Sequence, residues 1–276
     1  MSDAGYREVP EQDGKQKRRS RDSIANTLIV AIGVSLVCSV LVSATAVVLK
    51  PAQERNKALY RQKIVLEVAG LYQDGADIEQ LFSGIDARLV DLASGDYSDA
   101  ADAREFDATA ASSDPELSIT IPEDVDIAGI RRRSIYAPVY IVRDGGEIEQ
   151  VILPVHGKGL WSTMYGYLAV EPDGITVRGL QFYEHAETPG LGDQLEKPDW
   201  LAQWPGKQLF DEEGVLRIEV VRGQAPPGDM AVYQVDGMSG ATLTGRGVSN
   251  LLRYWIGPHG FGPYLDRLGD EDYDDG

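Results

Sequence analysis

Residues 137–156 read A-P-V-Y-I-V-R-D-G-G-E-I-E-Q-V-I-L-P-V-H, and this stretch decides the fold. Its two halves, 137–143 and 147–156, are rich in β-branched and aromatic residues, which favour strands. Asp144-Gly145-Gly146 separates them, and such residues are typical of the tight turn of a hairpin. The stretch therefore predicts two antiparallel strands that pair with each other.

A second hairpin follows directly along the chain. Residues 166–170 and 175–185 have the same character, and Pro172-Asp173-Gly174 lies between them as a turn. Two further segments, 216–222 and 231–235, are predicted to be strands. The middle of the chain is therefore expected to form a sheet rich in antiparallel pairs.

Helical periodicity occurs on either side of these last strands. Residues 198–203 predict a short helix, and residues 242–255 predict a longer one, with Val248, Leu251, Leu252 and Trp255 on one face. Helices with one apolar face bury that face against a sheet. The predicted fold class is α+β, an antiparallel-rich sheet domain with packed helices.

The N-terminal part of the chain contains a long apolar run. No residue from 23 to 49 is charged, and a helix over 28–49 is long enough to cross the ~30 Å hydrocarbon core of a bilayer. We predict one transmembrane helix over 24–49. A cleaved signal peptide is the alternative, because basic residues precede the run and Ala44-Thr45-Ala46 fits a cleavage site. The apolar run is longer than the usual ~7–15 residues of a signal peptide and continues past that site.

Basic residues flank the apolar run on both sides. A cluster of five lies just before it and five lie just after it: Lys15, Lys17, Arg18, Arg19 and Arg21, then Lys50, Arg55, Lys57, Arg61 and Lys63. The denser N-terminal cluster favours a cytoplasmic tail over 1–23 and an extracytoplasmic domain over 50–268. That domain is expected to begin with a helical stalk over about 53–72, and 94–115 are expected to be irregular. Residues 269–276 form a predicted acidic tail.

Composition excludes several classes of protein. The net charge of −18 excludes a nucleic-acid-binding chain, because an acidic surface repels phosphate backbones. The single cysteine, Cys38, excludes an intrachain disulfide and a cysteine-ligated iron–sulfur cluster. The chain has three histidines and no HExxH, G-x-G-x-x-G or GxxxxGK motif, so we expect no metal site and no directly bound NADH.

The segment 236–245, D-G-M-S-G-A-T-L-T-G, lies between a predicted strand and the longer predicted helix. Ser239 is suited to an N-cap, and Gly240 and Ala241 allow an anion such as a phosphate to approach the first turn. A plain helix start explains the same spacing. A serine hydrolase is a third interpretation, but Ala241 replaces the second glycine of G-x-S-x-G and no acid lies between Ser239 and His259.

Residues 236–242, D-G-M-S-G-A-T, resemble the flavinylation motif of a family of FMN-binding subunits. Two further segments fit the same family: P-V-H-G-K-G-L-W-S-T-M-Y-G at 154–166 and H-A-E-T-P-G-L-G at 185–192. With the N-terminal helix, they resemble the C-type subunit of the sodium-translocating NADH:quinone reductases. The G-type subunit of the related Rnf electron-transport complexes shares the second segment and S-G-A-T, whereas the segment at 154–166 favours the sodium pump.

The resemblance implies a site for covalently bound FMN. Thr242 would carry the phosphoester, attached by a flavin transferase, while Ser239, Gly240 and Ala241 would shape the approach and Thr244 would hydrogen-bond at the helix start. Leu160 and Trp161 would cover the ring, unless Trp161 belongs to the sheet core. Glu187 and Thr188 would bond the polar edge of the ring or cap the next segment, and Gly190 and Leu191 would form a nearby turn. No catalytic acid or base is expected.

The resemblance also implies a function and a location. The chain would relay electrons within a multi-subunit NADH:quinone reductase of the bacterial inner membrane, while partner subunits oxidise NADH and pass the ion. The open alternatives are an Rnf-type flavin subunit, a membrane-anchored serine hydrolase, and an anchored interaction domain without a chromophore.

Overall fold

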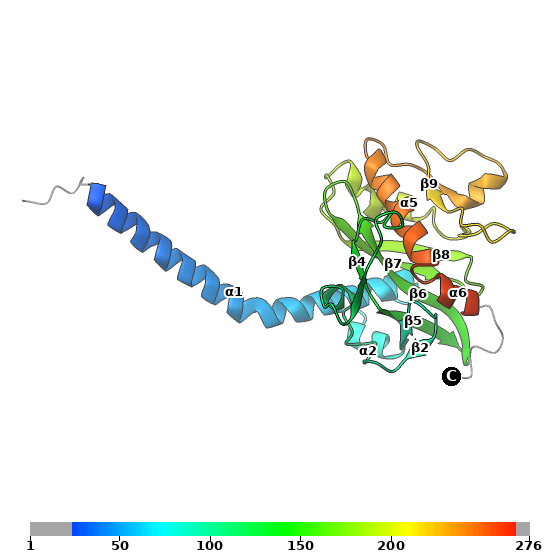
Figure 1. Cartoon of the computed structure of the whole chain (residues 1–276), viewed down its shortest axis with the longest axis horizontal. Coiled ribbons are helices and arrows are strands. Elements are labelled where there is room, and N and C mark those ends of the chain that lie inside the picture. Colours follow the sequence, from blue (N-terminus) through cyan, green and yellow to red (C-terminus); the bar gives the residue numbers. More distant parts are fainter. Residues whose placement is uncertain (1–23, 269–276) are drawn as a thin grey trace, which may run out of the picture. The chain divides into compact units, whose positions relative to one another are not determined.

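The computed structural model describes residues 24–268 and contains one long helix, a main sheet and several short helices (Figure 1). The described residues fall into two compact units, within Met1–Arg55 and Asn56–Gly276. The predicted tails, 1–23 and 269–276, lie outside the described residues.

Helix α1 spans Ile24–Val68 and covers both the predicted membrane span and the predicted stalk. The span predicted over 24–49 and the stalk predicted over about 53–72 are thus one continuous helix with Pro51 inside it, and the helix ends at Val68. An interior proline removes one backbone hydrogen bond and clashes with the carbonyl four residues earlier, so the helix continues past Pro51 at a local cost. The apolar part is long enough to cross a membrane and is fully exposed, consistent with a single-pass anchor.

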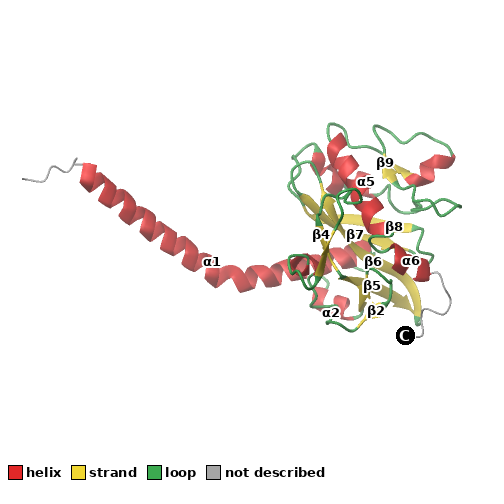
Figure 2. Ribbon diagram, in the orientation of Figure 1, coloured by secondary structure: helices red, strands yellow, loops and turns green. Residues whose placement is uncertain are grey.

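The main sheet has six strands in the order β2-β1-β5-β6-β7-β8, and every neighbouring pair is antiparallel (Figure 2). The strands are β1 (Asp86–Asp91), β2 (Tyr97–Ser98), β5 (Tyr136–Asp144), β6 (Glu147–Lys158), β7 (Thr163–Val170) and β8 (Val177–Glu184). The predicted α+β class with an antiparallel-rich sheet is therefore confirmed.

Both predicted hairpins are present. The turn between β5 and β6 is made by Gly145 and Gly146, whose φ angles of 61° and 99° only glycine adopts readily. Strands β7 and β8 pair across residues 171–176, where the Asp173 carboxylate accepts hydrogen bonds from the backbone N–H groups of Ile175 and Thr176, both at 2.8 Å.

The two later predicted strands are shorter than expected. Only β9 (Glu219–Val220) and β10 (Gln234–Val235) form, and they pair in parallel, outside the main sheet. The expected strand over 231–235 is mostly the 3-10 helix η2 (Asp229–Tyr233). Residues 216–218 instead hydrogen-bond to the segment around Leu209 and Phe210. The backbone N–H groups in these bonds are therefore not available to extend β9.

The remaining elements are short. They are α2 (Ile78–Ser83), α3 (Ala108–Ala111), β3 (Ser118–Thr120), β4 (Arg132–Ser134), η1 (Gly192–Glu196), α4 (Pro198–Leu201) and α6 (Gly262–Leu268). The expected helix at 198–203 is α4, while β2 and α3 lie within 94–115, which was expected to be irregular throughout.

Hydrophobic cores cover both faces of the sheet. Helix α5 (Thr242–Ile256), predicted over 242–255, packs with α6 on one face, where Leu251 and Leu252 contribute to the larger core. On the other face, Ile64, Val65 and Leu66 from the end of α1 join a smaller core. The sheet is therefore a fixed platform, and α5 is held against it.

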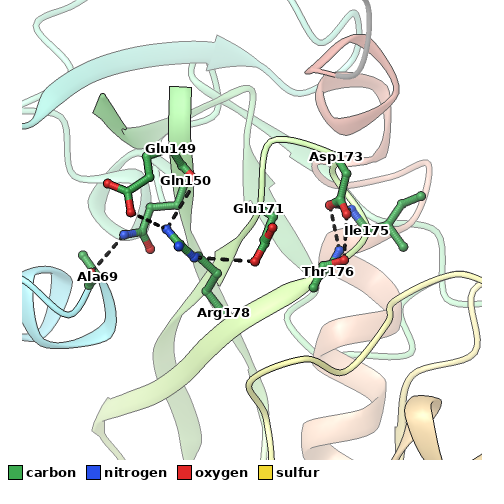
Figure 3. A network of polar contacts seen from close by, with 8 residues as sticks. All are labelled: Ala69, Glu149, Gln150, Glu171, Asp173, Ile175, Thr176 and Arg178. Atoms are coloured by element: carbon green, nitrogen blue, oxygen red, sulfur yellow. Dashed lines mark hydrogen bonds and ion pairs between the residues drawn. The ribbon is translucent and has the colours of Figure 1, made fainter. Parts of the chain in front are cut away.

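Polar contacts hold the strands of this sheet to one another and to the segment that follows α1 (Figure 3). Gln150 on β6 is buried and donates to the carbonyl oxygen of Ala69, just beyond α1, at 2.9 Å. Arg178 on β8 pairs with Glu149 at 2.9 Å and with Glu171 at 3.7 Å. The first contact ties the smaller core to the centre of the sheet, and the ion pairs join β8 to β6 and to the turn after β7.

Candidate functional site

The start of α5 differs from the expectation in one respect. The predicted N-cap, Ser239, is wrong: Ala241 occupies the N-cap position, and no side chain caps the helix. Gly240 has a φ of 75°, and this left-handed residue delays the first helical turn by two positions. Thr242 is therefore the first helical residue, and it is exposed.

The two threonines of this helix start face different surroundings. Thr244 is buried, and its hydroxyl donates to the carboxylate of Glu187 at 2.5 Å. The hydroxyl of Thr244 is therefore occupied inside the protein, whereas Thr242 lies at the surface. Of the two, Thr242 is the one whose hydroxyl a modifying enzyme can reach.

Glu187 lies at the centre of the contacts around this helix start. Its side chain is 5% exposed, and it accepts hydrogen bonds from the backbone N–H groups of Leu160 at 3.2 Å, Trp161 at 3.0 Å and Ser162 at 3.5 Å. Burial alone would raise the pKa of this carboxyl, but these bonds and the one from Thr244 outweigh it and lower the pKa below the usual value. Glu187 is thus held as a carboxylate.

The conformation of the loop between β6 and β7, residues 159–162, suits these hydrogen bonds to Glu187. Gly159 N–H donates to the Ser162 carbonyl oxygen at 2.7 Å, which closes the loop and directs its amides at Glu187. A Cβ on Gly159 would collide with the Glu187 carboxylate, so only glycine fits there. The hydroxyl of Ser162 accepts from the Ala186 N–H at 2.7 Å and adds a second tie between the two loops.

The expected turn after Glu187 is present. Leu191 N–H donates to the Thr188 carbonyl oxygen at 3.1 Å, and Gly190 has a φ of 78°, as a type II turn with Pro189 before glycine requires. Leu191 lies over Gly240, because a Cβ on that glycine would come within 2.7 Å of a Leu191 methyl group. The turn therefore contacts the loop that precedes Thr242.

Gln194 on η1 strengthens this contact. Its side-chain amide donates to the carbonyl oxygens of Leu191 at 2.8 Å and Ser239 at 2.9 Å. The sequence analysis missed this residue. No local pattern marks it, because its partner Ser239 is 45 residues away in the chain.

Exposed apolar side chains surround the start of α5. Leu160 is 41% exposed, Trp161 67%, Leu191 43% and Leu243 51%. The alternative that Trp161 is sheet core is wrong, and its indole N–H instead donates to the Thr188 hydroxyl at 2.9 Å. Leu243 was missed, although its place beside Thr242 in the first turn of an amphipathic helix was a usable signal.

The predicted residues thus form one cluster. The contacts through Glu187, Thr188 and Leu191 bring the segments 159–162, 187–194 and 239–244 together, although they are far apart in the chain. Around the exposed Thr242 hydroxyl, the cluster combines backbone N–H donors of a first helical turn with an exposed apolar rim.

This donor set fits a phosphorylated aromatic group. The N–H groups of a first turn lack intrahelical acceptors and favour one negative charge, and the apolar rim offers surface to a planar ring. A groove of about 470 Å³ lies elsewhere, beside α3, and its lining includes Phe106, Asp102 and Leu117 but none of the predicted site residues.

The geometry does not support a serine hydrolase. Ser239 precedes α5 and His259 follows it, so the whole 15-residue helix separates them, a length of about 22 Å. The ring of His259 stacks against Tyr254 near the far end of that helix. A histidine at that distance cannot activate the Ser239 hydroxyl.

Comparison with known proteins identifies a domain that spans this cluster. A family model described as "FMN-binding domain" matches residues 159–257, a range that contains the cluster. The C-type subunit of the Na(+)-translocating NADH-quinone reductase of Yersinia pestis is 47% identical over 257 residues, covering 91% of this chain and 96% of that protein. The protein of the same name from Pseudomonas aeruginosa is 46% identical and covers 90% and 97%.

Solved structures show the same fold. The crystal structure of Shewanella oneidensis NqrC matches with a TM-score of 0.71 at 40% identity, covering 79% of this chain and 98% of that one. The corresponding subunit from Parabacteroides distasonis matches with a TM-score of 0.62 at 25% identity, covering 79% and 96%. Relatives at this identity and coverage favour the sodium-pump subunit over the Rnf-type subunit. The chain belongs to the NqrC family, the C-type subunits of Na(+)-translocating NADH-quinone reductases, and carries the FMN-binding domain of that family.

Proposed function

We propose that this chain holds FMN covalently through a phosphoester to Thr242 and relays electrons between redox centres of partner subunits in a sodium-translocating NADH:quinone reductase. The observation that carries the proposal is the contrast between two neighbouring hydroxyls. Thr242 is exposed at the first turn of α5, whereas Thr244 is buried against Glu187.

Different residues around Thr242 would bind the phosphodiester and the ring of the flavin. The first-turn N–H groups of α5 hold the single charge of a phosphodiester, and Gly240, with its left-handed φ, lets Leu191 pack against the loop that precedes the helix. Leu160, Trp161 and Leu191 supply apolar contact area for the ring. Bound flavin supplies the capacity to accept and release electrons, so the chain itself needs no catalytic acid or base.

A covalent bond would keep the flavin at a site that is open to solvent. The surrounding apolar side chains are each more than two fifths exposed, and such a surface encloses a ligand far less than a closed pocket does. A covalent bond removes the dissociation step, so the group stays in place without deep burial. An exposed ring also leaves a short path to a redox centre of a partner.

The proposed placement in the cell follows from α1 and from the family. The helix anchors the chain in the bacterial inner membrane with residues 1–23 in the cytoplasm and the sheet domain on the periplasmic side. The basic cluster before the apolar run supports this orientation. A flavin transferase acting on the folded domain would attach FMN, and the other subunits of the complex would be the electron partners.

Intact mass and peptide mapping of the full chain from its native host test the attachment. We expect a mass gain of FMN less one water on the peptide that contains Thr242. Thr242→Val, which replaces the hydroxyl with a methyl group of similar size, should abolish this gain, because no oxygen is left to form the ester.

Thr244→Ser is the matched control. It retains the hydroxyl that donates to Glu187, so the protein should fold and load normally. Retention of the adduct in Thr242→Val would contradict attachment at residue 242, and peptide mapping of that variant would show which residue carries it. An unmodified wild-type chain from a host that makes the complete complex would contradict covalent attachment altogether.

A further inference from the structure

The carboxylate of Glu187 has no free acceptor position. One oxygen accepts from the N–H groups of Trp161 and Ser162, and the other accepts from the N–H of Leu160 and the hydroxyl of Thr244. A carboxylate has about four lone-pair sites, and an ionised one cannot donate. The resemblance left two roles open for Glu187, a bond to the polar edge of the ring or a bond within the protein. For the first of these the carboxylate has no acceptor position left.

Close backbone packing also encloses Glu187. A Cβ on Gly192 would lie 2.7 Å from the Glu187 Cβ and 3.0 Å from the Thr244 hydroxyl oxygen, and a Cβ on Gly159 would collide with the carboxylate. Glycine at both positions lets two loops close over this side chain. The result is a 5% exposed anion beneath the surface on which the apolar rim lies.

Three consecutive amides, those of residues 160–162, point at this one anion. Successive N–H groups arranged in this way form an anion-binding nest, and here its occupant is the protein's own carboxylate. The fourth bond comes from Thr244, two residues after the exposed Thr242. Glu187 thus links the loop that carries Leu160 and Trp161 to the first turn of α5.

We propose that Glu187 is a positioning residue. It fixes the loop 159–162 against the start of α5 through Thr244, and thereby sets where Leu160 and Trp161 lie relative to the group carried at Thr242, without contacting that group itself. The part of this inference that concerns the flavin rests on the proposed function, whereas the link between loop and helix does not.

Hydrogen–deuterium exchange tests the link on the full-length chain in detergent, in a Thr242→Val background that carries no flavin. Glu187→Leu should speed exchange of the peptide containing residues 160–162 at least 10-fold, because three amides lose their acceptor. Glu187→Gln should give a smaller increase, since its one carbonyl oxygen replaces two. Glu184→Leu, an exposed glutamate at the end of β8, is the matched control and should exchange like its parent.

Spectroscopy of the flavin-loaded chain tests the consequence for the site. Glu187→Gln and Thr244→Val should both shift the visible absorption maximum and the midpoint potential of the flavin in the same direction. Thr244→Ser keeps the hydroxyl donor and should restore both values to those of the wild type. A merely structural role would leave these two values unchanged in every variant that still loads.

The exchange and spectroscopic experiments distinguish failure of the Glu187 link from failure of the proposed function. If exchange at 160–162 in Glu187→Leu equals that in Glu184→Leu, the link is refuted. If Glu187→Gln shifts the flavin spectrum while Thr244→Val does not, Glu187 contacts the ring directly and the positioning role is wrong. If the wild type carries no flavin, the proposed function fails, and the exchange arm still decides whether Glu187 holds the loop. Glu187→Gln, which keeps the size of the side chain, decides the exchange arm if Glu187→Leu does not fold.

Discussion

Gly240 shows at the scale of one residue how a left-handed backbone conformation fixes the packing beside the start of α5. Its φ of 75° disfavours any side chain, and an added Cβ would come within 2.7 Å of Leu191. We expect Gly240→Ala to lower the free energy of unfolding by about 1–3 kcal/mol, partly from backbone strain and partly from this contact. Denaturant unfolding measures the change.

Gly214→Ala separates the two contributions. Gly214 has a nearly identical φ of 74° and no heavy atom within 4 Å of the added Cβ, so it reports the backbone strain alone. Equal losses in the two variants would show that Leu191 moves away at no cost, and that the turn at 188–191 does not constrain residue 240.

His156 is a second residue whose surroundings give a measurable effect. It lies on β6 between the rings of Tyr165, at 5.4 Å, and Trp255, at 4.7 Å, and burial lowers its pKa to about 4. The unfolded chain binds a proton near pH 6.5, while the folded chain does so only near pH 4. Stability from this residue is therefore fully present above pH 6.5 and falls as the pH is lowered toward 4.

Replacing His156 with phenylalanine removes the titration and keeps a ring. Between pH 7 and pH 5, wild type should lose about 2 kcal/mol more stability than His156→Phe. Denaturant unfolding at the two pH values measures this difference, and His259→Gln, at an exposed position, is the control. Parallel pH profiles for wild type and His156→Phe would show that the folded protein accepts the proton as readily as the unfolded one.

At the scale of elements, close packing between α5 and β6 holds the helix start in place. A Cβ on Gly247 would lie 2.6 Å from the carbonyl oxygen of Lys158, and one on Gly157 would lie 2.6 Å from the Cβ of Leu251. Gly247→Ala gains about 1 kcal/mol in helix propensity, but it forces two backbones apart. We expect a net destabilisation of about 1–2 kcal/mol, measured by thermal or denaturant unfolding.

The exposed neighbour Arg246 provides the comparison. Arg246→Ala makes a helix-favouring change on the outer side of α5 and should leave stability within about 0.5 kcal/mol of wild type. A Gly247→Ala variant as stable as Arg246→Ala would mean that α5 can shift on the sheet without loss.

The elements also show how far the sequence alone predicts this molecule. The hairpin of β5 and β6 was predictable because its alternation and its Gly145-Gly146 turn are local. The parallel pair of β9 and β10 was not, since it brings together two-residue strands about 15 residues apart. For the same reason the motif containing Glu187 did not reveal the contacts of that side chain, which bonds to residues 25 to 57 positions away.

At the scale of the whole chain, the end of α1 belongs to the core of the second compact unit. Ile64, Val65 and Leu66 are at most 2% exposed and pack with Phe82 and Tyr167. A chain beginning at residue 56 should therefore be soluble without detergent and fold cooperatively. A chain beginning at residue 70 lacks these three side chains and should lose at least 4 kcal/mol, given about 1.5–3 kcal/mol for each buried aliphatic side chain.

Circular dichroism and urea unfolding of the two truncated chains measure this difference. Single Leu66→Ala in the longer chain should cost about 2–5 kcal/mol and supplies a check that does not depend on the cut. Equal stability of both truncated chains would show that the smaller core forms without α1.

The packing of α6 into the larger core has a consequence for biogenesis. That core includes residues as late as Leu268, so the platform beneath Thr242 cannot close until α6 has been synthesised. An enzyme that recognises the ordered first turn of α5 would therefore meet its target only after both helices have left the ribosome. Chains that terminate before α6 would escape loading, and incorporation of the pigment would select for chains that contain it.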